Sequence, residues 1–415
     1  MTTSIFRARD GADIDGSRAW IRLAAAVCFG TLGGVGMWAV VVVLPPVQHE
    51  FSLDRGLASL SYTATMVGFG LGNVVVGRLI DRFGFVRPAF VSVLMLSGGF
   101  ATAALAPSFL LVALAQALIG VGGSVSFGPL LADISHWFDR RRGLAITVAA
   151  SGNYFAGALW PLAIRSALPD LGWRSTYLGI GLVCFIGMSV LLLILRGRPR
   201  TSGAGEGPVR ASGRKPLKTG ISPAALQGLL SLAGVGCCVA MSTPQVHIVA
   251  YSKDLGYGMA NGANMLSIML GAGIISRILS GHIADRVGGL LTLLMGSLLQ
   301  MFSLMLFVPL TGLSSLYALS LIFGLAQGGI VPSYAIIVRE YMPPEEAGRR
   351  VGMVIMATIA GMALGGWLSG FIHDHTGSYA AAFENGIAWN AMNAVVISFL
   401  LWRISRPRTM RELPV

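Results

Sequence analysis

The chain has 415 residues, of which 54% are hydrophobic and only 12% are charged, and its formal net charge is +12. A soluble globular protein carries roughly 25% charged residues. The composition therefore excludes most soluble enzymes and nucleic-acid-binding proteins and indicates an integral membrane protein. In such a chain the Lys and Arg residues report which loops face the cytoplasm, so their excess does not predict a nucleic-acid partner.

Uncharged windows long enough for a membrane-spanning helix of about 20 residues occur along the whole chain. The window 88–132 is broken at Ala106-Pro107-Ser108 and the window 287–338 between Pro309 and Ser315, so each holds two spans. The other windows hold one span each and lie at 23–48, 56–77, 143–164, 175–195, 219–252, 255–276, 351–372 and 385–402. None shows the alternation of a membrane β-barrel. The sequence predicts an all-α integral membrane protein with twelve transmembrane helices.

The distribution of basic residues predicts the orientation of these helices. Alternate loops, beginning with the N-terminal segment, carry 25 of the 30 Lys and Arg residues. Because positively charged loops stay in the cytoplasm, we expect both termini there, in the inner membrane of a bacterium. No cleavable signal peptide is expected. The loops of the other side carry four basic residues, Arg55, Arg165, Arg174 and Lys253.

One long stretch of low hydrophobicity divides the predicted spans six and six. It is rich in Gly, Ser and Arg and covers residues 196–221. Such a composition is typical of a flexible linker. The expected organisation is a cytoplasmic N-terminal segment, a six-helix bundle, the linker, a second six-helix bundle and a cytoplasmic tail, at 1–22, 23–195, 196–221, 222–402 and 403–415.

The two predicted bundles share a motif that indicates duplication. The first copy runs from Gly77 through Asp81 and Arg82, and the second from Gly281 through Asp285 and Arg286, with every matched position 204 residues apart. Each copy follows the second predicted helix of its half. Internal repeats of this kind are typical of secondary transporters.

The motif resembles the G-x-x-x-D-R-x-G signature of the major facilitator superfamily, and nearly the whole chain resembles that superfamily. The resemblance implies two pseudo-symmetric six-helix bundles, the major facilitator fold. It also implies that Gly77 and Gly281 let helices approach closely. The charged residues of both copies are then expected to form a cytoplasmic network that stabilises the outward-open state.

A second motif points to one branch of the superfamily. The segment from Trp137 to Ala145, followed by Ala149-Ala-Ser-Gly152, resembles the Y-F-x-K-R-R-x-L-A…A-x-A-G motif of the monocarboxylate transporter family. The resemblance implies a carrier of small carboxylates. It also implies a role at the cytoplasmic gate for the basic run, Arg140, Arg141 and Arg142.

Weaker similarities to the same family follow in chain order. Asp15–Trp20 before the first predicted helix, Gly172–Arg174 and Gly370–Phe383 are similar to segments of that family. Pro244–Gly256 is similar to bacterial members, which include oxalate/formate exchangers. Together they favour the bacterial branch of the group.

The sequence departs from the animal members at positions tied to proton coupling. Val40 to Val43 occupy the stretch of the first helix where those carriers have a Lys. Gly273 stands where they have an Asp. Their proton relay therefore cannot be transferred to this chain. Gln116 replaces the Arg of an antiporter-type R-x-x-x-G, which lowers the case for a drug/proton antiporter.

Arg277 is the strongest candidate for a substrate-binding residue. It lies eight residues before Asp285, about 12 Å into the membrane at 1.5 Å per residue. An Arg at that depth costs about 2.5–3.5 kcal/mol on insertion scales, and no carboxylate is predicted at the same depth. A guanidinium forms a bidentate pair with a carboxylate, so the substrate is the expected partner. The resemblance agrees, and the alternative is an Arg that snorkels to the cytoplasmic surface.

Eight further side chains in the predicted spans are candidates for substrate contact. His247 and Gln245 could hydrogen-bond a substrate, and the imidazole could take a proton near neutral pH. Asn153 and Tyr154 interrupt an apolar helix and could donate to a carboxylate. Each has an alternative interpretation as a helix-packing residue. The weaker candidates are Gln327, Tyr334, Trp38 and Asn264.

These patterns predict a secondary active transporter of a small monocarboxylate, such as a lactate- or pyruvate-like acid, that works by alternating access as a proton symporter. An exchanger of mono- or dicarboxylates, an exporter of hydrophobic or drug-like compounds and a non-transporting receptor stay open. No enzyme is expected, because no nucleophile motif, metal-ligand cluster or phosphate loop is present. The expected partners are the anion, protons and the bilayer. No cofactor, metal or nucleic acid is expected, and the carrier is expected to be a monomer.

Overall fold

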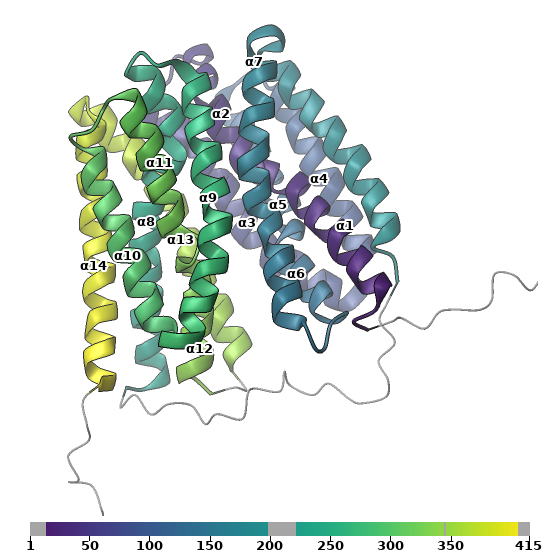
Figure 1. The fold of residues 1–415 in the computed structure, drawn as a ribbon. Coiled ribbons are helices and arrows are strands. Elements are labelled where there is room, and N and C mark those ends of the chain that lie inside the picture. The colour runs from purple at the N-terminus through teal and green to yellow at the C-terminus, as the bar shows by residue number, and fades with distance from the viewer. Residues whose placement is uncertain (1–13, 198–220, 344–345, 406–415) are drawn as a thin grey trace, which may run out of the picture.

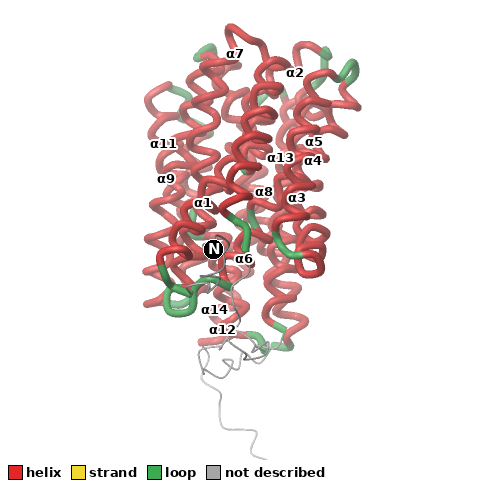
Figure 2. The backbone as a smooth tube through the Cα atoms, turned by 90° about the vertical axis from the view of Figure 1, so that its right-hand side faces the viewer, coloured by secondary structure: helices red, strands yellow, loops and turns green. Residues whose placement is uncertain are grey.

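The computed structural model describes residues 14–197, 221–343 and 346–405. All regular structure in these residues is helical (Figure 2), which confirms the predicted all-α class. Most of the predicted linker and parts of both predicted terminal segments lie outside the described residues. The helices are α1 Ser17–Gly33, α2 Val35–Glu50, α3 Arg55–Phe83, α4 Val86–Leu105, α5 Phe109–Gly123, the 3₁₀ helix η1 Ser124–Ser126, α6 Gly128–Ser135, α7 Arg142–Ile194, α8 Pro223–Asp254, α9 Gly258–Val287, α10 Gly289–Phe307, α11 Leu313–Gln327, α12 Ile330–Tyr341, α13 Ala347–Thr376 and α14 Tyr379–Ser405.

Eleven helical stretches of the described chain are long and apolar enough to cross a membrane. Three of them join shorter helices, namely α1 with α2, α5 with α6, and α11 with α12. Helix α7 has 53 residues, about 80 Å at 1.5 Å per residue, which is more than twice the thickness of the hydrocarbon core. It therefore makes two crossings, which meet at Gly172, where φ is 67°. The described residues thus hold the twelve predicted crossings.

The helices form two halves, α1–α7 and α8–α14 (Figure 1). Across the boundary between them α3 packs against α13, α7 against α9, and α2 against α8. The start of α1, the end of α7, the start of α8 and the end of α14 lie at one face, the lower one in Figure 1. We term it the terminal face and the other one the opposite face.

The helices extend beyond the uncharged windows at the terminal face. The shared motif was expected to follow the second helix of each half, and that prediction is wrong. Asp81 lies inside α3 and Asp285 inside α9. Each helix ends at a glycine with positive φ, Gly84 at 76° and Gly288 at 83°, a conformation that favours glycine. The charged side chains of these last turns, among them Asp81 and Asp285, are exposed.

Helix α1 also begins earlier than expected. Trp20 was predicted to precede the first helix, but α1 starts at Ser17 and contains it. The Trp20 ring packs edge-on against Phe138, with 5.3 Å between the ring centroids. The backbone N–H of Asp15 donates to the carbonyl of Trp137. These contacts hold the first turn of α1 against the α6–α7 link.

The sequence repeat is visible in the packing. A Cβ built on Gly120 of α5 would lie 2.1 Å from the carbonyl oxygen of Thr65 of α3. A Cβ built on Gly324 of α11 would lie 2.2 Å from the carbonyl oxygen of Met269 of α9. Both glycine and both carbonyl positions are 204 residues apart. Each half therefore depends on the same close helix approach, which only a residue without a side chain allows.

We expect Gly120→Ala to lower the thermal unfolding temperature of the purified protein. The added methyl group meets backbone, so α3 and α5 must separate, and overpacking of this kind costs about 1–3 kcal/mol. Gly179→Ala is the matched control, because a Cβ at Gly179 meets nothing within 4 Å. Equal unfolding temperatures for Gly120→Ala and the wild type would contradict this account.

Candidate functional site

Arg277 lies on α9 at the boundary with α7 and is half-buried. Its Nη1 donates to the carbonyl oxygen of Ala150 at 3.2 Å. Its guanidinium carbon lies 4.9 Å from the centroid of the Tyr154 ring. Both of these partners belong to α7, so the contacts of Arg277 join the two halves. Among the described residues no carboxylate lies within ion-pair distance of Arg277.

The departure at Gly273 has a structural consequence at this site. A Cβ on Gly273 would lie 2.5 Å from the Tyr154 ring. The absence of a side chain one turn before Arg277 therefore lets Tyr154 lie against α9. An Asp at this position would displace the ring and bring a carboxylate next to the guanidinium. In this chain the guanidinium faces an aromatic ring instead.

Two further predicted residues adjoin Tyr154. The indole N–H of Trp38 donates to the carbonyl oxygen of Asn153 at 3.2 Å. The side-chain oxygen of Asn153 is buried and has no hydrogen-bond partner in the described part of the chain. We use the name Arg277 cluster for Trp38, Asn153, Tyr154 and Arg277. It combines a cation, an aromatic face and an unsatisfied amide at the boundary of the two halves.

Other predicted residues lie in the interior of the second half. Gln245 of α8 donates to the side-chain oxygen of Gln327 at the end of α11. Tyr334 donates to Asn393 at 3.2 Å, and Asn264 donates to the hydroxyl of Tyr317 at 3.2 Å. None of these hydrogen bonds reaches Arg277. Their role in substrate contact stays a prediction.

A polar cluster at the opposite face joins the halves. Arg55 at the start of α3 donates from Nη1 to the hydroxyl of Tyr379 at 2.7 Å and pairs through Nη2 with Asp254 at 3.1 Å. The carboxylate of Asp374 accepts from the backbone N–H groups of Arg55 and Gly56 at 2.8 and 2.6 Å. A carboxylate of α13 thus caps the N-terminus of α3, where the helix dipole favours negative charge.

His247 belongs to this cluster and not to the Arg277 cluster. Its Nδ1 lies 3.2 Å from the Tyr379 hydroxyl and its Nε2 lies 2.8 Å from the carbonyl oxygen of Gly366. We use the name Arg55 cluster for Arg55, His247, Asp254, Asp374 and Tyr379. The other members could not be predicted from the sequence. Arg55 is 199 positions from Asp254 and 319 positions from Asp374, and no sequence pattern pairs residues so far apart.

The shared motif makes no comparable link at the terminal face. Within the described part of the chain Asp81 and Asp285 have no ion pair. A Cβ on Gly77 or Gly281 would meet nothing within 4 Å, so the predicted close approach at these glycines is absent. Arg82 and Arg286 lie in the last turns of α3 and α9. The ribbons of the two halves diverge toward this face (Figure 1).

In the described chain the basic run Arg140–Arg142, whose last residue begins α7, contacts residues of the first half only. The backbone N–H of Arg140 donates to the carboxylate of Asp15 at 3.0 Å and lowers the pKa of that carboxyl. The guanidinium carbon of Arg141 lies 5.8 Å from the centroid of the Trp20 ring. Arg142 donates to the hydroxyl of Ser135 at 3.1 Å. The three arginines therefore anchor the α6–α7 link to α1 and α6.

A buried ion pair joins Arg22 of α1 to Asp133 of α6. The carboxylate of Asp133 lies 2.7 Å from Nη2 of Arg22, and the two side chains are 14% and 3% exposed. The Arg22 guanidinium also lies 4.4 Å from the centroid of the Trp137 ring. Removal of one member of such a pair leaves an uncompensated buried charge. Asp133 therefore stabilises α1 against α6.

Two six-helix halves that meet along α3 and α13, α7 and α9, and α2 and α8 form the architecture of a membrane transporter. The sequence model of the Major Facilitator Superfamily matches residues 26–323 and 302–413. The chain belongs to the Major Facilitator Superfamily.

Named relatives are similar over most of their length. Monocarboxylate transporter 13 of Rattus norvegicus is 27% identical over 380 residues, which cover 89% of this chain and 86% of the relative. The uncharacterized MFS-type transporter YcxA of Bacillus subtilis is 26% identical and covers 85% and 87%. A solved structure of a bacterial homologue of the human lysosomal transporter Spinster, inward-facing and occupied, has a TM-score of 0.71 at 14% identity and covers 93% and 96%.

We expect Asp374→Ala to weaken closure of the opposite face. The substitution removes the cap of α3, which is worth about 1 kcal/mol, so the closed population falls several-fold relative to the open one. Distances between spin labels at Leu105 and Leu310, both exposed near the opposite face, measure the two populations. Asp170→Ala removes an exposed carboxylate of the same face and serves as the control. Unchanged distances in Asp374→Ala would show that closure does not depend on the cap.

Proposed function

We propose that the protein carries a small monocarboxylate across the membrane, with Arg277 as the residue that holds the carboxylate. The observation that supports this most is the half-buried guanidinium at the boundary of the two halves, which has no carboxylate partner among the described residues. The relatives named monocarboxylate transporters agree with this substrate class.

The guanidinium keeps donors free for a ligand. An Arg side chain has five N–H donors, and one hydrogen bond to Ala150 is present. A carboxylate can therefore form the bidentate pair that orients a small organic anion. The Tyr154 ring covers one face of the guanidinium and leaves its edge as the polar surface of the site.

Binding at this place can drive alternating access. Ala150 and Tyr154 belong to the first half and Arg277 to the second. Relative movement of the halves changes the surroundings of the guanidinium, so the bound and unbound forms differ in their preference for each state. A ligand shifts a conformational equilibrium only through such a difference in affinity.

The excess of basic residues in the loops of the terminal face supports a cytoplasmic location of that face. We propose the inner membrane of a bacterium as the location and an inward-facing state for this structure. The six-helix bundles over 23–195 and 222–402, joined by the 196–221 linker, then rock about the site as a monomer. Proton symport is the proposed mode, with anion exchange as the alternative.

Replacement of Arg277 is expected to reduce the stabilisation of the protein by small carboxylates. A ligand at 100 times its dissociation constant stabilises the wild type by about 2.7 kcal/mol, whereas Arg277→Gln offers no cation. Thermal unfolding of both proteins against a panel that includes lactate, pyruvate, formate and oxalate measures the difference. Arg339→Gln, at an exposed position near the end of α12, is the control. An equal response of Arg277→Gln and the wild type would remove Arg277 from the site and favour an exporter of uncharged compounds.

Proton symport predicts that an inward proton gradient drives lactate uptake into liposomes that contain the purified protein. A protonophore that collapses the gradient should then stop accumulation. Exchange predicts instead that uptake requires a second carboxylate inside the liposome and persists with the protonophore. The same liposomes with Arg277→Gln should show neither activity.

A further inference from the structure

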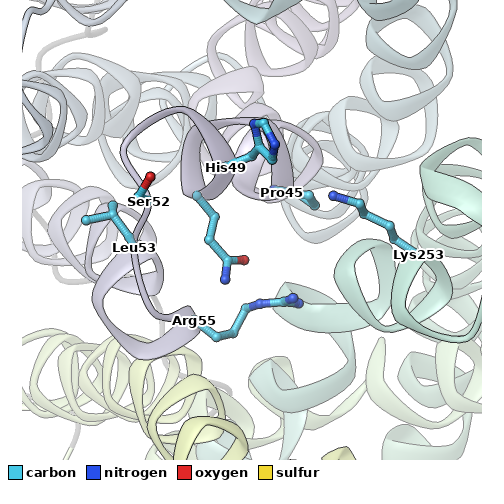
Figure 3. A pocket seen from close by; sticks show the side chains of 7 residues that line it. Pro45, His49, Ser52, Leu53, Arg55 and Lys253 are labelled. Carbon is cyan, nitrogen blue, oxygen red and sulfur yellow. The ribbon is translucent and has the colours of Figure 1, made fainter.

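A cavity of about 420 Å³ lies at the opposite face beside the Arg55 cluster. Its walls come from the end of α2, the α2–α3 link, the start of α3 and the end of α8, and its polar lining includes Gln48, His49, Arg55 and Lys253 (Figure 3). The volume falls within the range of about 300–1,000 Å³ that is usual for small-molecule sites. Because α8 belongs to the second half, the cavity is assembled from both halves.

The lining of the cavity is positively charged. Arg55 and Lys253 supply two cations, and none of the lining residues is an Asp or Glu. The charge of Arg55 is compensated by its ion pair with Asp254, so Lys253 carries the uncompensated charge. Lys253 has no ion pair within the described ranges of the chain. Figure 3 shows its side chain reaching from α8 toward Pro45 on α2. The charge favours an anion as the occupant.

Arg55, which lines this cavity, has one unused donor that is buried. The residue is only 7% exposed, and its two terminal nitrogens bind Tyr379 and Asp254. Its Nε is buried and has no hydrogen-bond partner in the part of the chain that is described. A buried N–H without a partner is unfavourable. The atom has almost no accessible surface, so an acceptor in the cavity reaches it only after a shift of the Arg55 side chain.

We propose that this cavity binds a small carboxylate anion, separate from the one at Arg277, and that the bound anion holds the opposite face closed. The anion accepts from Nε of Arg55 and pairs with the ammonium of Lys253, while Gln48 supplies an amide donor. The choice of a carboxylate rests on the proposed function, because a carrier's own substrate is the anion that reaches this face.

The direction of the effect follows from the position of the site. Lys253 belongs to the second half and Arg55 to the first. When the halves separate at this face, the two cations separate and the anion loses one of them. A ligand favours the state that it binds more tightly. A carboxylate bound at the opposite face therefore slows the change of the protein to the state that is open at this face. The cavity is then a regulatory site.

Binding of lactate to purified variants at constant chloride, measured by isothermal titration calorimetry, tests the site. Arg277→Gln removes the proposed transport site and should still bind one lactate. Addition of Lys253→Gln should weaken that binding at least about tenfold, since a charge-assisted contact is lost. Lys253→Arg keeps the cation and should retain the binding. Gln48→Leu should weaken it less than Lys253→Gln does.

The outcomes separate this inference from the proposed function. If Arg277→Gln binds no lactate while Lys253→Gln binds one, the cavity site is overturned and the transport site stands. If wild type and Arg277→Gln each bind one lactate, and Lys253→Gln abolishes it, the cavity site stands and the role of Arg277 fails. Absence of binding to the wild type overturns both.

Spin-label distances test the effect on closure. Labels at Leu105 and Leu310 are placed in a Cys28→Ser background, because Cys28 is exposed while the other three cysteines are buried. In Arg277→Gln, lactate should shift the distances toward the closed form, and Lys253→Gln should remove the shift. A shift toward the open form, or no shift while lactate is bound, would overturn the regulatory role.

Discussion

The absence of water in the bilayer core is the constraint on which this structure depends. Every backbone N–H and C=O group in lipid must find its partner within the protein, which is why the described regular structure is helical. The same constraint acts on buried polar side chains. Arg22 has Asp133, and Arg55 has Asp254 and Tyr379. Arg277 differs from both, because its partners are a carbonyl oxygen and an aromatic face.

This difference separates structural arginines from the candidate transport residue. A paired cation stabilises one arrangement of helices, and loss of its partner is costly. A cation without a carboxylate keeps part of its electrostatic attraction for a ligand. The position of Arg277 between α7 and α9 places that attraction where the two halves meet. The ligand can therefore affect the balance between states.

Two kinds of contact hold the molecule together, and they differ in permanence. Within each half, glycines such as Gly120 and Gly324 bring helices so close that a methyl group cannot enter. Such tight apolar packing has no alternative arrangement nearby. Between the halves, the Arg55 cluster closes the opposite face with hydrogen bonds and ion pairs. Polar groups near a face can exchange these partners for water, whereas the glycine contacts have no such substitute.

The sequence by itself determined the number of crossings, the division into two halves and the candidate Arg277. These follow from hydrophobic length, from the 204-residue repeat and from the high cost of an Arg in lipid, which are all local properties of the chain. Helix ends were less predictable, because the helices around Asp81 and Asp285 continue beyond the uncharged windows until a glycine with positive φ ends them.

Only the tertiary structure decided which polar residues meet. His247 lies against Tyr379, 132 positions away, and not in the Arg277 cluster. Arg55, expected to be a loop charge, joins α3 to Asp254 and Tyr379. Contacts over such separations depend on how whole helices pack, and no local pattern records them. The tertiary structure also decided that Gly273 makes room for Tyr154 and that Arg55 and Lys253 line one cavity, because both depend on surfaces from different halves.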